Sequence, residues 1–184
     1  MADYTDNALL ASIKALEQVV LPAVDARDPL ATEQLRLAAG FFKFVRARLD
    51  LWYPRHVFEL NHYLELAQML REDARALSDA VAERLESAIE QACAVKAASV
   101  PLPADMRRAT ATLSECASAV ARIAAAGDAQ LRRRVERQVL AHSKRWVDMQ
   151  RAWFLPQGFE LRPDALPSLE QALSLGASPP RDRA

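Results

Sequence analysis

The chain has 184 residues, of which 51% are hydrophobic and only four are glycine. A composition rich in alanine and leucine and poor in glycine favours helices over turn-rich β folds. The 24 basic residues balance the 24 acidic residues, which excludes nucleic-acid binding through the overall charge of the protein.

The first predicted helix begins after Thr5 or Asp6, whose side chains can accept hydrogen bonds from free backbone N–H groups. Pro22 is expected to kink or end this helix. Asp28 followed by Pro29 then indicates a new helix, with an N-cap residue and a proline at the first helical position.

The second predicted helix, over about 29–50, is apolar nearly all round, most clearly at Phe41, Phe42 and Phe44. A helix of this kind lies at the centre of a bundle or forms half of an interface. These phenylalanines are therefore candidates for an interaction surface, with another protein or with a second copy of the chain.

Prolines and capping residues divide the rest of the chain. Tyr53-Pro54 starts a third helix, and Ser78 offers the cap of a fourth. The run Val100–Pro103 holds two prolines and breaks the chain before a fifth helix over about 104–126. Gly127-Asp128 ends that helix and caps the last long one.

The expected fold class is therefore all-α, an antiparallel bundle of five or six helices over residues 1–155. Five of the ten prolines lie in residues 156–184, which predicts a C-terminal tail with one short helix near Leu166–Leu173 and a frayed end from Ser178 onward. The N-terminus is polar and acidic, and no apolar run approaches the ~20 residues that cross a bilayer. A cytoplasmic protein is expected.

The last long helix has an apolar stripe at steps of four and three, which places its members on one helix face. The members of this stripe are Leu131, Val135, Val139, His142, Trp146, Met149 and Trp153. A structural histidine with one hydrogen bond is the simplest interpretation of His142. The alternative is a catalytic base or ligand in a pocket with Trp146, Tyr63 and His56, which needs a carboxylate partner from another helix.

Glu59 and His62 have the Glu-x-x-His spacing that bundle metalloproteins use, because residues three apart share a helix face. A second such pair, which the dinuclear pattern requires, does not occur in the sequence. The stripe of the third helix places His62 toward solvent, and His56 lies about 120° away around the helix. Glu59 and His62 are therefore weak metal candidates, and no metal or cofactor is expected.

The outer face of the last helix is basic, with Arg133, Arg137, Lys144 and Arg151 opposite the apolar stripe. Residues 65–90 are predominantly acidic. The simplest interpretation is two solvated surfaces that attract each other weakly. The functional alternatives are a docking surface for a partner of opposite charge and a phosphate site at Arg132-Arg133-Arg134.

The sequence has no GxSxG elbow, no glycine-rich phosphate loop and no CxxC pair, and these absences argue against nucleophilic catalysis and nucleotide binding. Cys93 and Cys116 are expected to be buried free thiols.

Three stretches of the first two helices carry a family resemblance. They are Leu9-Leu10 leading to Val19–Val24, then Glu33–Ala38, then Arg46–Asp50. In this order they resemble small all-helical bacterial partner proteins of aminoglycoside-phosphotransferase-like hydroxyacyl-CoA kinases. The resemblance implies a non-catalytic partner that supports an enzyme of acyl-CoA catabolism, such as the kinase or an acyl-CoA dehydrogenase, and it assigns no site residues.

The sequence thus predicts a non-catalytic accessory protein with a protein partner. A small helical enzyme or ligand-binding bundle with a pocket around His142 and Trp146 is the alternative, and a homodimer through the phenylalanine-rich second helix is a third possibility. No nucleic-acid or membrane partner is expected.

Overall fold

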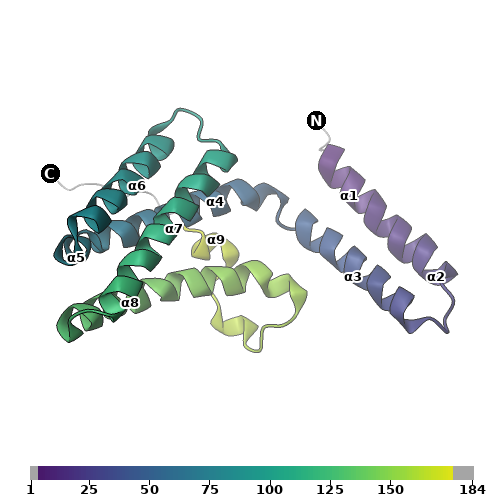
Figure 1. The fold of residues 1–184 in the computed structure, drawn as a ribbon. Helices are drawn as coiled ribbons and strands as arrows, with labels where there is room; N and C mark the ends of the chain where they lie inside the picture. Colours follow the sequence, from purple (N-terminus) through teal and green to yellow (C-terminus); the bar gives the residue numbers. More distant parts are fainter. Residues whose placement is uncertain (1–3, 176–184) are drawn as a thin grey trace. The chain divides into compact units, whose positions relative to one another are not determined.

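The computed structural model describes residues 4–175 and is helical throughout, with no strand in that range (Figure 1). The all-α prediction is confirmed. The α-helices are α1 (Tyr4–Ala15), α2 (Leu21–Ala23), α3 (Pro29–Arg46), α4 (Trp52–Met69), α5 (Arg71–Leu77), α6 (Asp79–Ala97), α7 (Pro103–Ala125), α8 (Ala129–Phe154) and α9 (Leu169–Ala172). A π-helical turn, η1 (Leu16–Val20), joins α1 to α2, and the 3₁₀ turns are η2 (Leu49–Leu51), η3 (Leu155–Gln157) and η4 (Pro163–Ala165).

The chain divides into two compact units. The N-terminal unit comprises the residues up to Trp52 together with Phe154–Leu161. The C-terminal unit comprises Tyr53–Trp153 and the residues from Arg162 onward. The sequence pattern predicts one bundle over residues 1–155 and does not indicate this division. The end of the predicted tail, from Ser178, lies outside the described residues.

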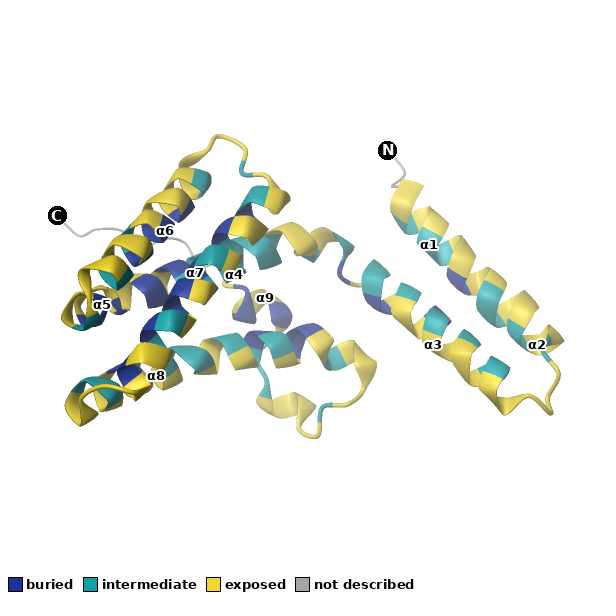
Figure 2. Cartoon of the chain, viewed as in Figure 1, coloured by how far each residue is buried: buried dark blue, intermediate teal, exposed yellow. Residues whose placement is uncertain are grey.

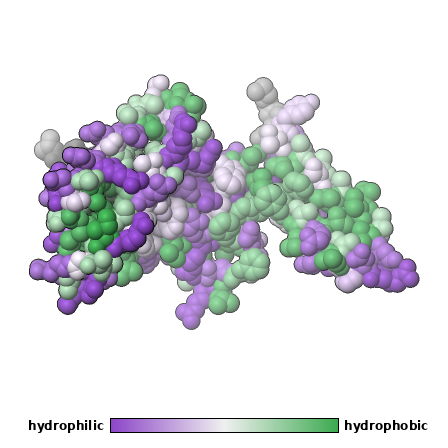
Figure 3. Space-filling view, in the orientation of Figure 1, coloured by the Kyte–Doolittle hydropathy of each residue, from purple (hydrophilic) through white to green (hydrophobic). Residues whose placement is uncertain are grey.

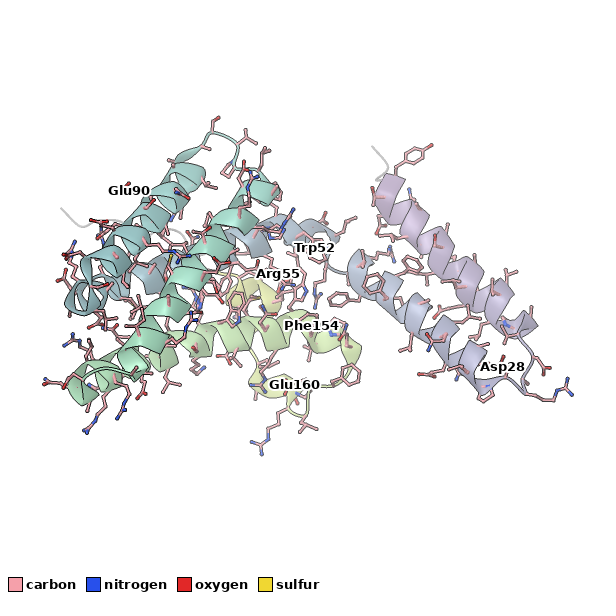
Figure 4. The ribbon with its side chains drawn as sticks, in the orientation of Figure 1. Asp28, Trp52, Arg55, Glu90, Phe154 and Glu160 are labelled. Carbon is pink, nitrogen blue, oxygen red and sulfur yellow. The ribbon has the colours of Figure 1, made fainter. Side chains whose placement is uncertain are left out.

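Local signals set the helix boundaries in the N-terminal unit. Asp28 accepts a hydrogen bond from the backbone N–H of Ala31 at 2.9 Å, and Pro29 stands at the start of α3 (Figure 4). The N-cap prediction is confirmed. Pro22 lacks a backbone N–H, and the helix widens into η1 just before it and ends at Ala23.

The N-terminal unit is a helical hairpin of α1, η1 and α2 against α3, with a small core. Its buried hydrophobic residues are Ile13, Ala39 and Phe44. The ring of Phe44 stacks on that of Phe154, with centroids 5.7 Å apart. Ion pairs from Lys43 to Glu17 (2.5 Å) and from Arg46 to Asp6 (2.7 Å) link the two arms. Half-exposed pairs of this kind contribute little stability.

The main hydrophobic core lies in the C-terminal unit and draws on α4, α5, α6, α7 and α8 (Figure 2). Helices α6 and α7 run side by side, joined through the two prolines after Val100. The Ser78 side chain accepts from the Val81 N–H at 3.2 Å and caps α6, as predicted. Asp128 caps α8 in the same way.

The stripe predicted for the last long helix faces this core, because Val135, Met149 and Trp153 are fully buried in α8. The Arg55 guanidinium of α4 (Figure 4) lies 4.4 Å from the centre of the Trp153 ring. None of the helices described in residues 4–175 combines the length and apolar character that crossing a membrane requires.

One charged side chain is buried among the described residues of the C-terminal unit. The Asp73 carboxylate is almost fully buried, and its Oδ1 accepts from Arg134 Nε at 2.5 Å. Its Oδ2 has no hydrogen-bond partner among the described residues. The Arg134 side chain is half exposed, so the two partners of this pair differ sharply in their access to water.

This difference predicts an asymmetric response to mutation. Arg134→Ala should lower the free energy of unfolding by about 1–3 kcal/mol, because it leaves a buried carboxylate unpaired. Asp73→Ala should cost less, since the remaining guanidinium is already hydrated, and the double variant should match Asp73→Ala. Urea unfolding measures these values, with exposed Arg137→Ala as control. Equal costs for the two single variants would contradict the interpretation.

Candidate functional site

His142 lies half-buried on α8 and is held by the backbone of α4. Its Nε2 is 2.7 Å from the carbonyl oxygen of His62. A carbonyl oxygen only accepts hydrogen bonds, so Nε2 carries the proton and donates. This partner is a backbone carbonyl and differs from the carboxylate that the catalytic interpretation of His142 requires.

His62 is 4% exposed, so the prediction that it faces solvent is wrong. Phe58, His62 and Leu66 form a second stripe at steps of four along α4, and all three are buried. Neighbouring parts of the protein therefore bury a wider arc of α4 than the single apolar stripe that the sequence predicts. The signal was present in the sequence, because Phe58 and Leu66 mark this second stripe.

The two imidazoles form the centre of an aromatic cluster. The rings of His62 and His142 stack with centroids 4.1 Å apart and 26° between their planes. The Tyr63 ring meets His62 edge-on at 5.2 Å, and Trp146 lies 5.1 Å from it. The Phe58 ring completes the cluster at 6.0 Å.

The surroundings of His62 keep its imidazole neutral. Burial, followed by the neighbouring His142 and Arg145, lowers the pKa of His62 to about 4, because each of them disfavours a charged ring. Its Nδ1 is buried and has no hydrogen-bond partner among the described residues. A buried, uncharged nitrogen without a partner is uncommon in a folded protein.

A cavity of about 200 Å³ lies beside this cluster, between α4, α7 and α8. His62, Tyr63 and Trp146 form its aromatic wall. The opposite wall is the α7 small-residue stripe, defined here as Ser114, Ala117, Ser118 and Ala121. The short side chains of this stripe leave the space that longer side chains would fill.

Two residues of the pocket predicted from the sequence, His142 and His56, lie outside the cavity. His142 touches His62 but does not line the cavity, and neither does His56. His56 Nδ1 lies 3.5 Å from Glu59 Oε2 on the same helix, and its Nε2 lies 3.5 Å from Arg107. Of the residues predicted for the pocket, Tyr63 and Trp146 line the cavity.

The weak metal candidates do not form a cluster. Glu59 accepts from Arg55 Nε at 2.8 Å. Across residues 4–175, no group of three or more His, Cys, Asp or Glu residues is placed to hold a metal ion. Both cysteines are free thiols, as predicted, and Cys116 is buried. Cys93 is exposed, so the prediction that it is buried is wrong.

Most residues of the predicted interaction surfaces are exposed, and the exceptions are two of the three phenylalanines. Arg133, Arg137, Lys144 and Arg151 are all exposed on α8. Phe41 is exposed and Phe42 is half-buried. Phe44 is 7% exposed because it stacks on Phe154, so its assignment to an interaction surface is wrong.

Phe41 lies with other exposed apolar residues on one side of α3. Leu30, Leu37 and Phe41 are 69%, 56% and 59% exposed, and their steps of seven and four place them on one side of the helix. Gly40 is exposed on the same side. These four residues are called the α3 apolar face below. Figure 3 shows hydrophobic residues over much of the visible surface of the N-terminal unit.

No protein-family model, curated protein or solved structure matches this chain. Its function is therefore inferred from its own geometry and chemistry.

The lowered pKa of His62 predicts a stability that depends on pH. Between pH 6.5 and 4 the unfolded chain binds a proton at His62 that the folded chain does not. The free energy of unfolding should therefore fall as the pH drops through this window, by on the order of 3 kcal/mol, with no further loss from His62 below pH 4.

His62→Phe keeps an aromatic ring but cannot titrate, so this variant should lose that component of the pH dependence. Urea unfolding of both proteins at several pH values measures the difference. Equal slopes between pH 4 and 6.5 in the two proteins would contradict the assignment.

Proposed function

We propose that the protein is a non-catalytic accessory protein that binds an enzyme of acyl-CoA or related small-acid catabolism through the α3 apolar face. The partner class comes from the family resemblance in the first two helices. We also propose a cytoplasmic location and an antiparallel arrangement of five or six helices, as the sequence predicts.

The observation that carries the proposal is the distribution of hydrophobic side chains. The N-terminal unit holds about a third of the described residues. It contains ten of the eighteen exposed large hydrophobic residues in the described chain, but three of the twenty-eight buried hydrophobic ones. Exposed apolar surface of this density is typical of interaction sites.

Gly40 supports a close approach by a partner. A glycine inside a helix is less favourable than alanine by roughly 0.5–1 kcal/mol. A Cβ placed on Gly40 would meet no atom within 4 Å, so nothing in the hairpin requires the absence of a side chain. A partner that packs against Leu37 and Phe41 would explain this glycine, because a residue without a side chain lets the partner's backbone come close to α3.

The resemblance and the structural division coincide along the chain. The stretches that carry the resemblance run from Leu9 to Asp50, and the N-terminal unit includes the chain up to Trp52. The resembling segment thus corresponds to the unit that presents the α3 apolar face. This correspondence supports binding of the partner through the N-terminal unit.

The double substitution Leu37→Asp/Phe41→Asp should abolish partner binding without unfolding the protein, because both side chains are already exposed. Isothermal titration against the purified hydroxyacyl-CoA kinase and acyl-CoA dehydrogenase of the same organism measures binding. Lys14→Asp is the control, since it changes the charge by the same two units at an exposed residue of α1 in the same unit, away from the α3 apolar face. Light scattering of the protein alone comes first. If the protein is a dimer and the double substitution dissociates it, the face binds a second copy and the proposal is contradicted. An absence of binding to both enzymes would also contradict the proposal.

Gly40→Ala separates stability from binding at the same face. The free chain should gain about 0.5–1 kcal/mol in its free energy of unfolding, because alanine favours the helix. Partner affinity should fall in the same variant, since a methyl group would occupy the place of closest approach. Thermal unfolding and titration measure the two effects. Unchanged affinity would show that the partner does not pack against Gly40.

A further inference from the structure

The cavity in the C-terminal unit has the size of a single substituted ring. A dry cavity of ~150 Å³ with apolar walls accommodates benzene. The space between α4, α7 and α8 is about 200 Å³. Ser118 at its edge is exposed, so the space is open to solvent on one side, and one six-membered ring with a small substituent would fill it.

The walls of the cavity suit a flat molecule. Tyr63 and Trp146 lie on one side, with ring centroids 5.4 Å apart and planes inclined at 65°. The α7 small-residue stripe lies on the other side. Aromatic rings attract one another through offset and edge-to-face contacts, and this wall offers both kinds of contact to an incoming ring.

The polar groups around the cavity are uncharged. Ser114, Ser118 and Ser143 supply hydroxyl groups. Ser143 Oγ donates to the carbonyl of Val139 at 2.7 Å, so its oxygen is left to accept. No lining residue among those described has a carboxylate, ammonium or guanidinium group, and the lowered pKa of His62 keeps its imidazole neutral at pH 7. A charged ligand would lose its hydration here without gaining an opposite charge.

His62 adds an uncharged ring to the aromatic wall of the cavity. It lines the cavity, its side chain is almost fully buried, and its Nδ1 lacks a hydrogen-bond partner among the described residues. Buried nitrogens of this kind are normally paired. This atom has almost no accessible surface, so a molecule in the cavity would meet the serine hydroxyls and not this nitrogen.

The geometry points to a binding site for an uncharged, single-ring aromatic molecule with a hydroxyl group, of the phenol type, in the cavity between α4, α7 and α8. The ring would lie between the Trp146 side and the α7 small-residue stripe. Its hydroxyl group would exchange hydrogen bonds with the serine hydroxyls. This site is separate from the α3 apolar face and does not depend on the proposed accessory role.

Phenol, benzene and benzoate are the probes for this proposal, titrated into the ¹⁵N-labelled full chain. Phenol should produce saturable amide shifts around Tyr63, Ser114 and Trp146, with a dissociation constant on the order of 1 mM. Benzene should bind about tenfold more weakly, because it forms no hydrogen bond. Benzoate should not bind, since no cation lines the cavity.

Two variants locate the site. Ser114→Leu fills the cavity and should weaken phenol binding by at least about tenfold. Thr112→Leu makes a similar change on the same helix outside the cavity and should leave phenol binding unchanged. Ser114→Ala keeps the space but removes one hydroxyl group, so it should weaken phenol binding and spare benzene. This last variant tests the site even if Ser114→Leu does not fold.

Three results would overturn the proposal. The first is the absence of saturable shifts around the cavity with phenol. The second is unchanged phenol binding in a folded Ser114→Leu protein or, where that variant does not fold, in Ser114→Ala. The third is benzoate binding as tight as that of phenol, which would exclude an uncharged ligand class.

Discussion

The hydrogen bond from His142 to the carbonyl of His62 organises the centre of the C-terminal unit. It joins α8 to α4 at 2.7 Å and fixes which nitrogen of His142 carries the proton. It also brings the two imidazoles into a stack. Burial is the main cause of the lowered pKa of His62, and the nearby His142 adds to it, so that the His62 ring in the wall of the cavity is uncharged.

The two units use their hydrophobic side chains in opposite ways. The C-terminal unit encloses them in a core and leaves one small hollow where α7 has short side chains. The N-terminal unit encloses few of them and presents the rest on α3. A small neutral ligand suits the first arrangement, and a partner protein suits the second. The two proposals concern different surfaces and can be tested separately.

Sequence reasoning succeeded where the signal is local. Asp28, Ser78 and Asp128 accept from backbone N–H groups within three residues, so their caps are visible without the fold. It failed where burial depends on packing between helices. His62 was assigned to solvent because a single stripe was considered, and Phe44 was assigned to a surface because its partner, Phe154, is distant in sequence. The cavity could not be foreseen, since its walls come from three helices.

The stacking of Phe44 on Phe154 has a consequence for synthesis of the protein. The two residues are about 110 positions apart, although both belong to the N-terminal unit. During translation, the hairpin of α1 and α3 leaves the ribosome long before Phe154 is made. Its small core stays incomplete over that interval, with the α3 apolar face open to other chains. A chaperone or an early partner would therefore meet this unit first, while the C-terminal unit is still being made.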